Sequence, residues 1–136
     1  KKKELMIAGA NNPLYMIKPI NKIELDENVL KSNTHFLTKI EGDRQPVGSY
    51  LNEKPFTHTT IKLEGDELFY MTSDGIIDQF GGPNDKKYRG ITFQNDLLEI
   101  NQKPLPEQKY IIEQKFNNWK GDLEQLDDVC LIGFKV

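Results

Sequence analysis

The sequence predicts an α+β protein of one domain, because strand patterns and helix patterns occupy different parts of the chain. Short apolar or alternating segments, bounded by Gly, Pro, Asn and Asp, fill most of the first 72 residues. Clear helical spacing appears later, between residues 93 and 120, and a last apolar strand ends the chain. The length of 136 residues suits a single domain.

Strands are predicted for five segments of the first half, with a shorter edge strand at 23–25: residues 4–10, 14–17, 36–40, 56–63 and 68–71. The turn at Asn12-Pro13 is so short that it predicts an antiparallel hairpin between the first two strands. The Glu64-Gly65-Asp66-Glu67 stretch predicts a second hairpin turn, because glycine accepts a positive φ there.

The second half predicts helices around a loop. A helical turn is expected at residues 76–80. An exposed mobile loop is expected at 81–87, and a short helix near 93–100. The clearest helix covers 104–120, with a proline in its first turn, a glycine at its end, and an apolar face at i, i+4 and i+7 formed by Ile112, Phe116 and Trp119. Trp119 is therefore expected in the core rather than as a cofactor platform.

Composition excludes several classes of protein. The hydrophobic fraction of 37% and charged fraction of 29% are those of a soluble globular protein. A net charge of −3 gives no support to nucleic-acid binding, and no apolar run could span a bilayer. The basic start lacks the long apolar stretch of a signal peptide. A single cysteine, Cys130, excludes an internal disulfide, so we expect a cytoplasmic protein.

Acidic residues stand at the ends of two predicted core strands. Asp74 and Gly75 follow one strand, whereas Asp127 and Asp128 precede the last one, 127 − 74 = 53 residues later. If these strands are antiparallel neighbours, their acids converge at one rim of the sheet. Clustered carboxylates without His or Cys favour Mg²⁺ or Mn²⁺. The alternative is that Asp74-Gly75 forms only a turn.

Other chemistry-bearing residues give weaker signals. His35 and His58 lack metal-ligand spacing and are expected to be ordinary surface or partly buried residues. Cys130 lies in an apolar stretch, where burial would raise its pKa and make it a poor nucleophile. The Gly81-Gly82-Pro83 stretch lacks the Lys-Ser/Thr ending of a phosphate-binding loop.

Two longer stretches, residues 72–82 and 119–133, resemble the last two motifs of metal-dependent serine/threonine phosphatases. The closer resemblance is to the bacterial SpoIIE-type branch (stage II sporulation protein E), which is related to the protein phosphatase 2C or PPM family. Residues 8–14, 46–48 and 65–68 resemble that branch too, in the expected order. The resemblance therefore extends over essentially the whole chain.

This resemblance implies two antiparallel sheets flanked by helices, an antiparallel β-sandwich, with two Mn²⁺ or Mg²⁺ ions at one end. In this interpretation Asp74 and Asp127 are ligands of one metal ion. Asp128 either lies just beyond the direct ligands of that ion or is an alternate ligand. Gly75 keeps the approach to the metal open. Asn11 and Asn12 are placed as substrate contacts.

The resemblance also shows a departure from the family. Relatives carry a Gly-Asp motif and a Gly-His-Gly motif further upstream, and neither occurs in this sequence. Residues 1–136 are therefore interpreted as the C-terminal portion of one SpoIIE-type domain, with little activity alone. Half a sandwich leaves apolar surface uncovered, which predicts a homodimer or an accompanying segment.

The resemblance also implies a substrate and a neighbouring domain. It implies a phosphorylated protein as substrate, with an antagonist of an anti-sigma factor as the example, and a sensory domain preceding the phosphatase in a bacterial signalling protein. The alternative is a catalytically inactive regulatory or binding module of the same fold.

Overall fold

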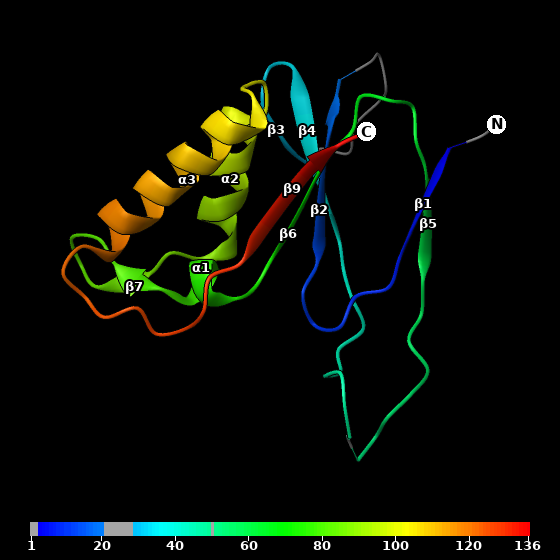
Figure 1. Cartoon of the computed structure of the whole chain (residues 1–136), viewed down its shortest axis with the longest axis horizontal. Coiled ribbons are helices and arrows are strands. Elements are labelled where there is room, and N and C mark those ends of the chain that lie inside the picture. Colours follow the sequence, from blue (N-terminus) through cyan, green and yellow to red (C-terminus); the bar gives the residue numbers. More distant parts are fainter. Residues whose placement is uncertain (1–2, 21–28, 50) are drawn as a thin grey trace.

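The computed structural model describes residues 3–20, 29–49 and 51–136, which form three packed layers (Figure 1). The central layer is an antiparallel sheet of five strands in the order β3-β4-β2-β6-β9. Their bounds are Leu30–Lys31, His35–Ile40, Leu14–Pro19, Leu68–Thr72 and Leu131–Lys135. The predicted edge strand at 23–25 lies outside the described residues.

Helices α2 (Gly90–Ile100) and α3 (Leu105–Lys120) cover one face of this sheet (Figure 1). Both helices were predicted and are confirmed, as is the short turn of helix α1 (Gly75–Asp78) after β6. Their apolar faces and the inner face of the sheet form the larger core cluster: Tyr15, Ile17, Leu37, Leu68, Tyr70, Ile76, Tyr88, Phe93, Leu97, Leu98, Ile100, Ile112 and Phe116.

The opposite face of the sheet is covered by a two-stranded ribbon, in which β1 (Glu4–Ile7) pairs antiparallel with β5 (Thr59–Lys62). A second apolar cluster joins this ribbon to the sheet: Leu14, Met16 and Phe69, with Leu5, Ile7, Ile40, Ile61, Leu63, Phe134 and Val136 packed against them. The predicted antiparallel sandwich flanked by helices is therefore confirmed.

The runs Leu14–Ile17 of β2 and Leu68–Tyr70 of β6 are continuously apolar because these parts of the strands are buried on both faces. Tyr15 and Ile17 point toward the helices, whereas Leu14 and Met16 face the ribbon. Successive side chains of a strand point to opposite faces, so a strand covered on both sides needs a continuous apolar run.

The predicted hairpin between the first two strands is wrong. Strand β1 pairs with β5, and β2 pairs with β4 and β6, so the short turn between them is a corner that changes layers. Asn11 takes a positive φ of 60° at this corner. Its N–H donates to the Asp43 carbonyl (2.8 Å), and the Asp43 N–H donates to the Gly9 carbonyl (2.8 Å). These bonds replace the ladder that a hairpin would have formed.

The second predicted hairpin is wrong for the same reason, since β5 and β6 belong to different layers. Gly65 does adopt a positive φ of 104°. The corner is held by Glu67, whose buried carboxylate accepts the N–H groups of Glu64 (2.7 Å) and Gly65 (2.9 Å). The Lys18 ammonium lies 3.1 Å from the same carboxylate. Sequence spacing cannot distinguish this cross-layer corner from a turn within a sheet.

The segment 81–87 is not wholly irregular, as had been expected. Strands β7 (Phe80–Gly81) and β8 (Lys86–Lys87) form a small antiparallel pair. Gly81 packs so tightly that an added Cβ would lie 1.9 Å from the Trp119 carbonyl oxygen. Trp119 itself is partly buried, edge-to-face with Tyr88 at 5.3 Å between ring centroids, which confirms its predicted place in the core.

Strand β9 differs from the buried strand that its sequence suggested. It pairs with β6 at the edge of the five-stranded sheet, and each of its residues is either half-buried or exposed. Cys130 precedes the strand and is exposed, so the expectation that its thiol is buried is wrong. The apolar run had signalled burial on two faces, but an edge strand receives less cover. None of the helices in the described ranges has the length and hydropathy needed to cross a membrane.

Candidate functional site

The register of the sheet brings four strand ends together. Leu14 at the start of β2 lies opposite Ile40 at the end of β4 and Met71 near the end of β6. Met71 in turn lies opposite Ile132 near the start of β9. Antiparallel pairing therefore gathers the segments that follow β4 and β6 and those that precede β2 and β9 at one end of the sheet. We call this the acidic end, because Asp74, Asp127 and Asp128 belong to it.

Ser73 joins the two acid-bearing segments directly. Its N–H donates to the Cys130 carbonyl (3.0 Å), and the Cys130 N–H donates to the Ser73 Oγ (3.0 Å). The Ser73 hydroxyl also donates to the Asp128 carbonyl (2.8 Å). The strands beside Asp74 and Asp128 are antiparallel neighbours, which meets the condition set from the sequence, and these bonds extend their pairing beyond the strand ends.

Gly75 brings the same segments into contact. It is buried at the start of α1, and a Cβ placed on it would lie 2.5 Å from the Asp128 carbonyl oxygen and 3.0 Å from its carbonyl carbon. Heavy atoms do not approach backbone so closely, so only glycine lets α1 rest on residue 128. The sequence missed this packing role, and the expected part of Gly75 in keeping a ligand approach open stays a prediction.

The three acids are exposed, and within the described ranges none of them forms an ion pair with a lysine, arginine or histidine. Asp74 occupies the N-cap position of α1, but its side chain makes no capping hydrogen bond. An aspartate that served only the turn would be expected to use its carboxylate on nearby N–H groups. The side chain of Asp74 thus has no structural task that the described contacts reveal.

The donor chemistry of the acidic end fits a hard divalent cation. Its side-chain donors are carboxylate oxygens, which Mg²⁺ and Mn²⁺ prefer. Among the residues that the structure describes, no three His, Cys, Asp or Glu side chains gather closely enough to enclose an ion on their own. Asp74, Asp127 and Asp128 therefore do not form such a group, and an ion held by fewer of them would need water or other groups to complete its coordination.

Gln79 fixes the course of the chain before Asp127. This glutamine is 1% exposed and lies directly after α1. Its Nε2 donates to the Glu124 carbonyl (3.0 Å), and the Leu126 N–H donates to its Oε1 (3.4 Å). The sequence interpretation missed Gln79, since a polar residue beside a helical turn gives no sign that it is buried.

Asn11 and Asn12 also lie at this end of the sheet, in the corner between β1 and β2. No hydrogen bond of the described residues joins either side chain to the acids, and their predicted contact with substrate stays a prediction. Asp43 was missed, although it follows strand β4 much as Asp74 follows β6. Its carboxylate is already used, because it accepts the Thr57 N–H (2.7 Å) and hydroxyl (3.0 Å).

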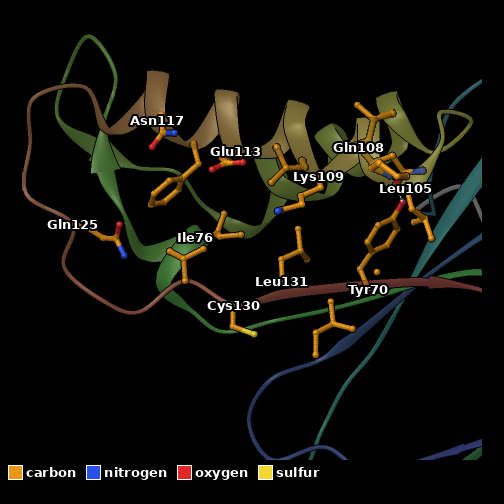
Figure 2. A pocket seen from close by; sticks show the side chains of 17 residues that line it. Tyr70, Ile76, Leu105, Gln108, Lys109, Glu113, Asn117, Gln125, Cys130 and Leu131 are labelled. Carbon is orange, nitrogen blue, oxygen red and sulfur yellow. Dashed lines mark hydrogen bonds between the residues drawn. The ribbon is translucent and has the colours of Figure 1, made fainter.

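A separate groove of about 950 Å³ runs between α3 and strand β9 (Figure 2). Figure 2 shows Tyr70 and Leu131 on the sheet side and Gln108 and Glu113 on the helix side. The Tyr70 hydroxyl donates to Gln108 Oε1 (2.6 Å) at one end of it. Burial raises the pKa of Tyr70, so that its hydroxyl stays protonated. The groove is mainly apolar and lacks the three acids, so it is distinct from the acidic end.

The order of strands and the paired helices are those of a protein phosphatase 2C-like (PPM) fold. The SiaA-PP2C domain of Pseudomonas aeruginosa is a solved structure with this fold, and the chain is similar to it with a TM-score of 0.79. The match has 22% sequence identity and covers 99% of this chain and 47% of that one, so this chain spans about half the length of the solved structure. No family model and no curated protein matches the sequence.

Proposed function

We propose that this chain is part of a metal-dependent phosphatase that hydrolyses phosphoserine or phosphothreonine on a bacterial signalling protein. The observation that supports the proposal is the β6–β9 pairing, which brings the backbone segments that carry Asp74, Asp127 and Asp128 to one end of the sheet. The PPM-type fold supports the same reaction class.

Asp74 and Asp127 would hold one Mn²⁺ or Mg²⁺ ion, and Asp128 would orient that ion's water or act as an alternate ligand. When bound, such ions lower the pKa of water and neutralise phosphate oxygens. The chain's own contribution is positional. Ser73 and Gly75 fix the distance between the two acidic segments, and Gln79 sets the path of the loop before Asp127.

The proposed substrate is a phosphorylated protein, for which an antagonist of an anti-sigma factor is the example. A cytoplasmic location and a preceding sensory domain belong to this proposal. The match to 47% of the neighbour's length is consistent with further ligands coming from other parts of the phosphatase.

The test is the Asp74→Asn variant of the full-length protein, with Mn²⁺-dependent hydrolysis of p-nitrophenyl phosphate and of a phosphoserine peptide as readouts. We expect a loss of more than about a hundredfold, because the variant removes a ligand charge. Since Asp74 makes no capping bond, stability should change by less than about 0.5 kcal/mol. Asp122→Asn, an exposed acid in the following loop, is the matched control and should retain activity. Full activity of the Asp74 variant would refute the assignment.

A catalytically inactive module is the second candidate, and the absence of a three-acid cluster among the described residues favours it. Calorimetric titration of the full-length protein with Mn²⁺ distinguishes the two. Binding that disappears in the Asp74→Asn variant supports the enzyme. No binding by the wild-type protein supports the module.

A further inference from the structure

The two acid-bearing segments differ in how firmly the fold holds them. Asp74 is the N-cap of helix α1, whose first two residues are buried. Asp127 and Asp128 instead belong to residues 121–130, which are all described by the structure, are all exposed, and contain no helix or strand. Figure 1 shows this segment passing α1 on its way from α3 to β9. Because exposed segments without secondary structure open easily, the position of these two acids depends on a few specific bonds.

The backbone ladder between β6 and β9 ends before it reaches the acids. Its last pair is Thr72 with Leu131, and one further bond follows, from the Ser73 N–H to the Cys130 carbonyl (3.0 Å). Within residues 3–20, 29–49 and 51–136, no backbone–backbone hydrogen bond involves Asp128. Strand pairing alone therefore does not hold Asp128, and side chains must do so.

Two hydroxyl groups at the end of β6 make this connection. The Ser73 hydroxyl accepts the Cys130 N–H (3.0 Å) and donates to the Asp128 carbonyl (2.8 Å), so it spans Val129 and fixes the direction of the chain there. The buried Thr72 hydroxyl lies within donating distance of both the Cys130 carbonyl (3.0 Å) and the Ser73 carbonyl (2.9 Å). We call the bonds from these two hydroxyls to residues 128 and 130 the clasp.

The clasp links the neighbour of one acid to the backbone of another. Ser73 is covalently joined to Asp74, and its hydroxyl is bonded to the carbonyl of Asp128. A rotation of the peptide group that follows Asp128 would also move the carboxylate on the same residue. The absence of a Cβ at Gly75 permits the two segments to approach, whereas the clasp keeps them from separating.

The position of the segment and the stability of the fold depend on the Ser73 hydroxyl to different degrees. Ser73 is only half-buried, and Asp128 and Cys130 are exposed. If the hydroxyl is removed, water can therefore bond to the Cys130 N–H and to the Asp128 carbonyl, so little stability should be lost. Water molecules would not keep the two segments at a fixed distance, so the acids would lose their arrangement while the protein stays folded.

We propose that Ser73 is a positioning residue for the ion site, because its hydroxyl holds the segment of Asp127 and Asp128 beside Asp74 before an ion binds. This inference rests on the proposed function. It adds that ion affinity depends on a hydroxyl group that is not itself a ligand. Thr72 has the lesser part, since its hydroxyl is shared between two carbonyls and the Cys130 carbonyl also accepts the Ser73 N–H.

The test is a calorimetric titration of the full-length protein with Mn²⁺. Ser73→Ala should raise the Kd for Mn²⁺ about tenfold, which is the effect typical of groups that orient metal ligands. Ser73→Thr keeps the hydroxyl and should bind Mn²⁺ within about threefold of wild type. Thr72→Val should weaken binding less than Ser73→Ala does, and a larger loss in Thr72→Val would contradict the assignment to Ser73.

Activity gives a second readout that separates positioning from chemistry. In Ser73→Ala, the Mn²⁺ concentration for half-maximal hydrolysis of p-nitrophenyl phosphate should rise in parallel with the Kd. At saturating Mn²⁺ its kcat should stay within about threefold of wild type, because the bound ion then holds the acids itself. A kcat that stays more than about a hundredfold low at saturating Mn²⁺ would mean that Ser73 acts in the chemical step, and it would overturn the positioning role.

Ser32→Ala is the matched control. Ser32 is also half-buried, and its hydroxyl accepts the His35 N–H (3.0 Å) and donates to the His35 carbonyl (3.2 Å). It lies between β3 and β4, at the opposite end of the sheet from the acids. Both serine variants should lose similar stability in urea, but Ser32→Ala should leave the Kd for Mn²⁺ unchanged. An equal loss of affinity in both variants would be a general effect of stability and would overturn the proposal.

Amide hydrogen exchange tests the clasp without metal. In the metal-free protein, Ser73→Ala should speed exchange at Cys130, whose N–H loses its acceptor, whereas Ser32→Ala should not. Unchanged exchange at Cys130 in Ser73→Ala would show that this bond does not hold the segment, and the proposal would fail.

The outcomes separate the two levels of inference. If the wild-type protein neither binds Mn²⁺ nor hydrolyses p-nitrophenyl phosphate with it, the proposed function fails and the positioning role fails with it. If the wild-type protein does both, but Ser73→Ala binds Mn²⁺ as wild type does, only the positioning role is refuted. The same holds if Ser73→Thr binds as weakly as Ser73→Ala, because the hydroxyl would then not be the group that matters.

Discussion

Replacing Gly75 with alanine tests whether close backbone packing sets the geometry of the acidic end. The added Cβ would lie 2.5 Å from the Asp128 carbonyl oxygen, whereas ordinary contacts begin at 3.4 Å. The two segments must therefore separate by about 0.9 Å, because the obstacle is backbone and cannot rotate away. Forcing one extra methyl group into such packing costs about 1–3 kcal/mol.

The same shift should impair the proposed chemistry more than the stability. Moving the Asp128 segment away from Asp74 by nearly 1 Å alters the spacing of the carboxylates, and a misplacement of about 1 Å can reduce a rate about a hundredfold. We expect Gly75→Ala to remain folded but to need a higher Mn²⁺ concentration for half-maximal hydrolysis of p-nitrophenyl phosphate.

Gly90→Ala is the matched control. An added Cβ there would meet only Gln94 Nε2, at 3.7 Å, which is an ordinary contact. Gly90 is the first residue of α2, so alanine should leave stability unchanged or raise it by up to about 1 kcal/mol.

The assays are urea unfolding of the full-length protein and the Mn²⁺ dependence of its activity. The explanation predicts a difference between the two glycine variants in both measurements. If Gly75→Ala unfolds at the wild-type urea concentration with unchanged Mn²⁺ dependence, the packing of Gly75 on Asp128 does not set the site geometry.

Three further predictions concern single side chains. Gln79→Ala should cost about 1–3 kcal/mol and speed amide hydrogen exchange at Leu126, because the Glu124 carbonyl and the Leu126 N–H lose their bonds to the buried Gln79 side chain; unchanged exchange would contradict this. Burial alone would raise the Glu67 pKa, but the N–H groups and Lys18 around it outweigh burial and lower it to about 2. Its stabilisation, on the order of 3 kcal/mol, should be complete above about pH 4.5 and lost toward pH 2, so wild type and Glu67→Gln should converge in urea titrations at low pH. Cys130 should react with a thiol reagent in the native protein within about tenfold of its unfolded rate, and strong protection would show that it is covered.

Local sequence patterns predicted the helices well because their signals are local. The i, i+4, i+7 spacing of Ile112, Phe116 and Trp119 requires one apolar face, and Gly121 ends the helix with a positive φ of 55°. The same reasoning located β2 and β6, whose continuous apolar runs are long enough only for buried strands. The sequence did not predict which strands pair with one another. Both predicted hairpins were wrong because a short turn does not reveal whether the chain stays in one sheet.

The candidate site shows the same division. The sequence placed Asp74 after one strand and Asp127 and Asp128 before another, and it required no structure to recognise carboxylates at strand ends. Whether those ends meet depends on which strands pair, and the register of β6 with β9 settled that. Buried Gln79 gave no sequence signal, since a glutamine is normally exposed and its partners lie 45 and 47 residues away.

The sequence by itself determined the positions of most strands and helices, the apolar faces and the chemical identity of the acids, because each follows from residues within a few positions of one another. Only the tertiary structure decided the layer of each strand, the exposed edge at β9 and the contact of Gly75 with Asp128. These features arise from contacts between residues far apart in the chain, and no local preference encodes such contacts.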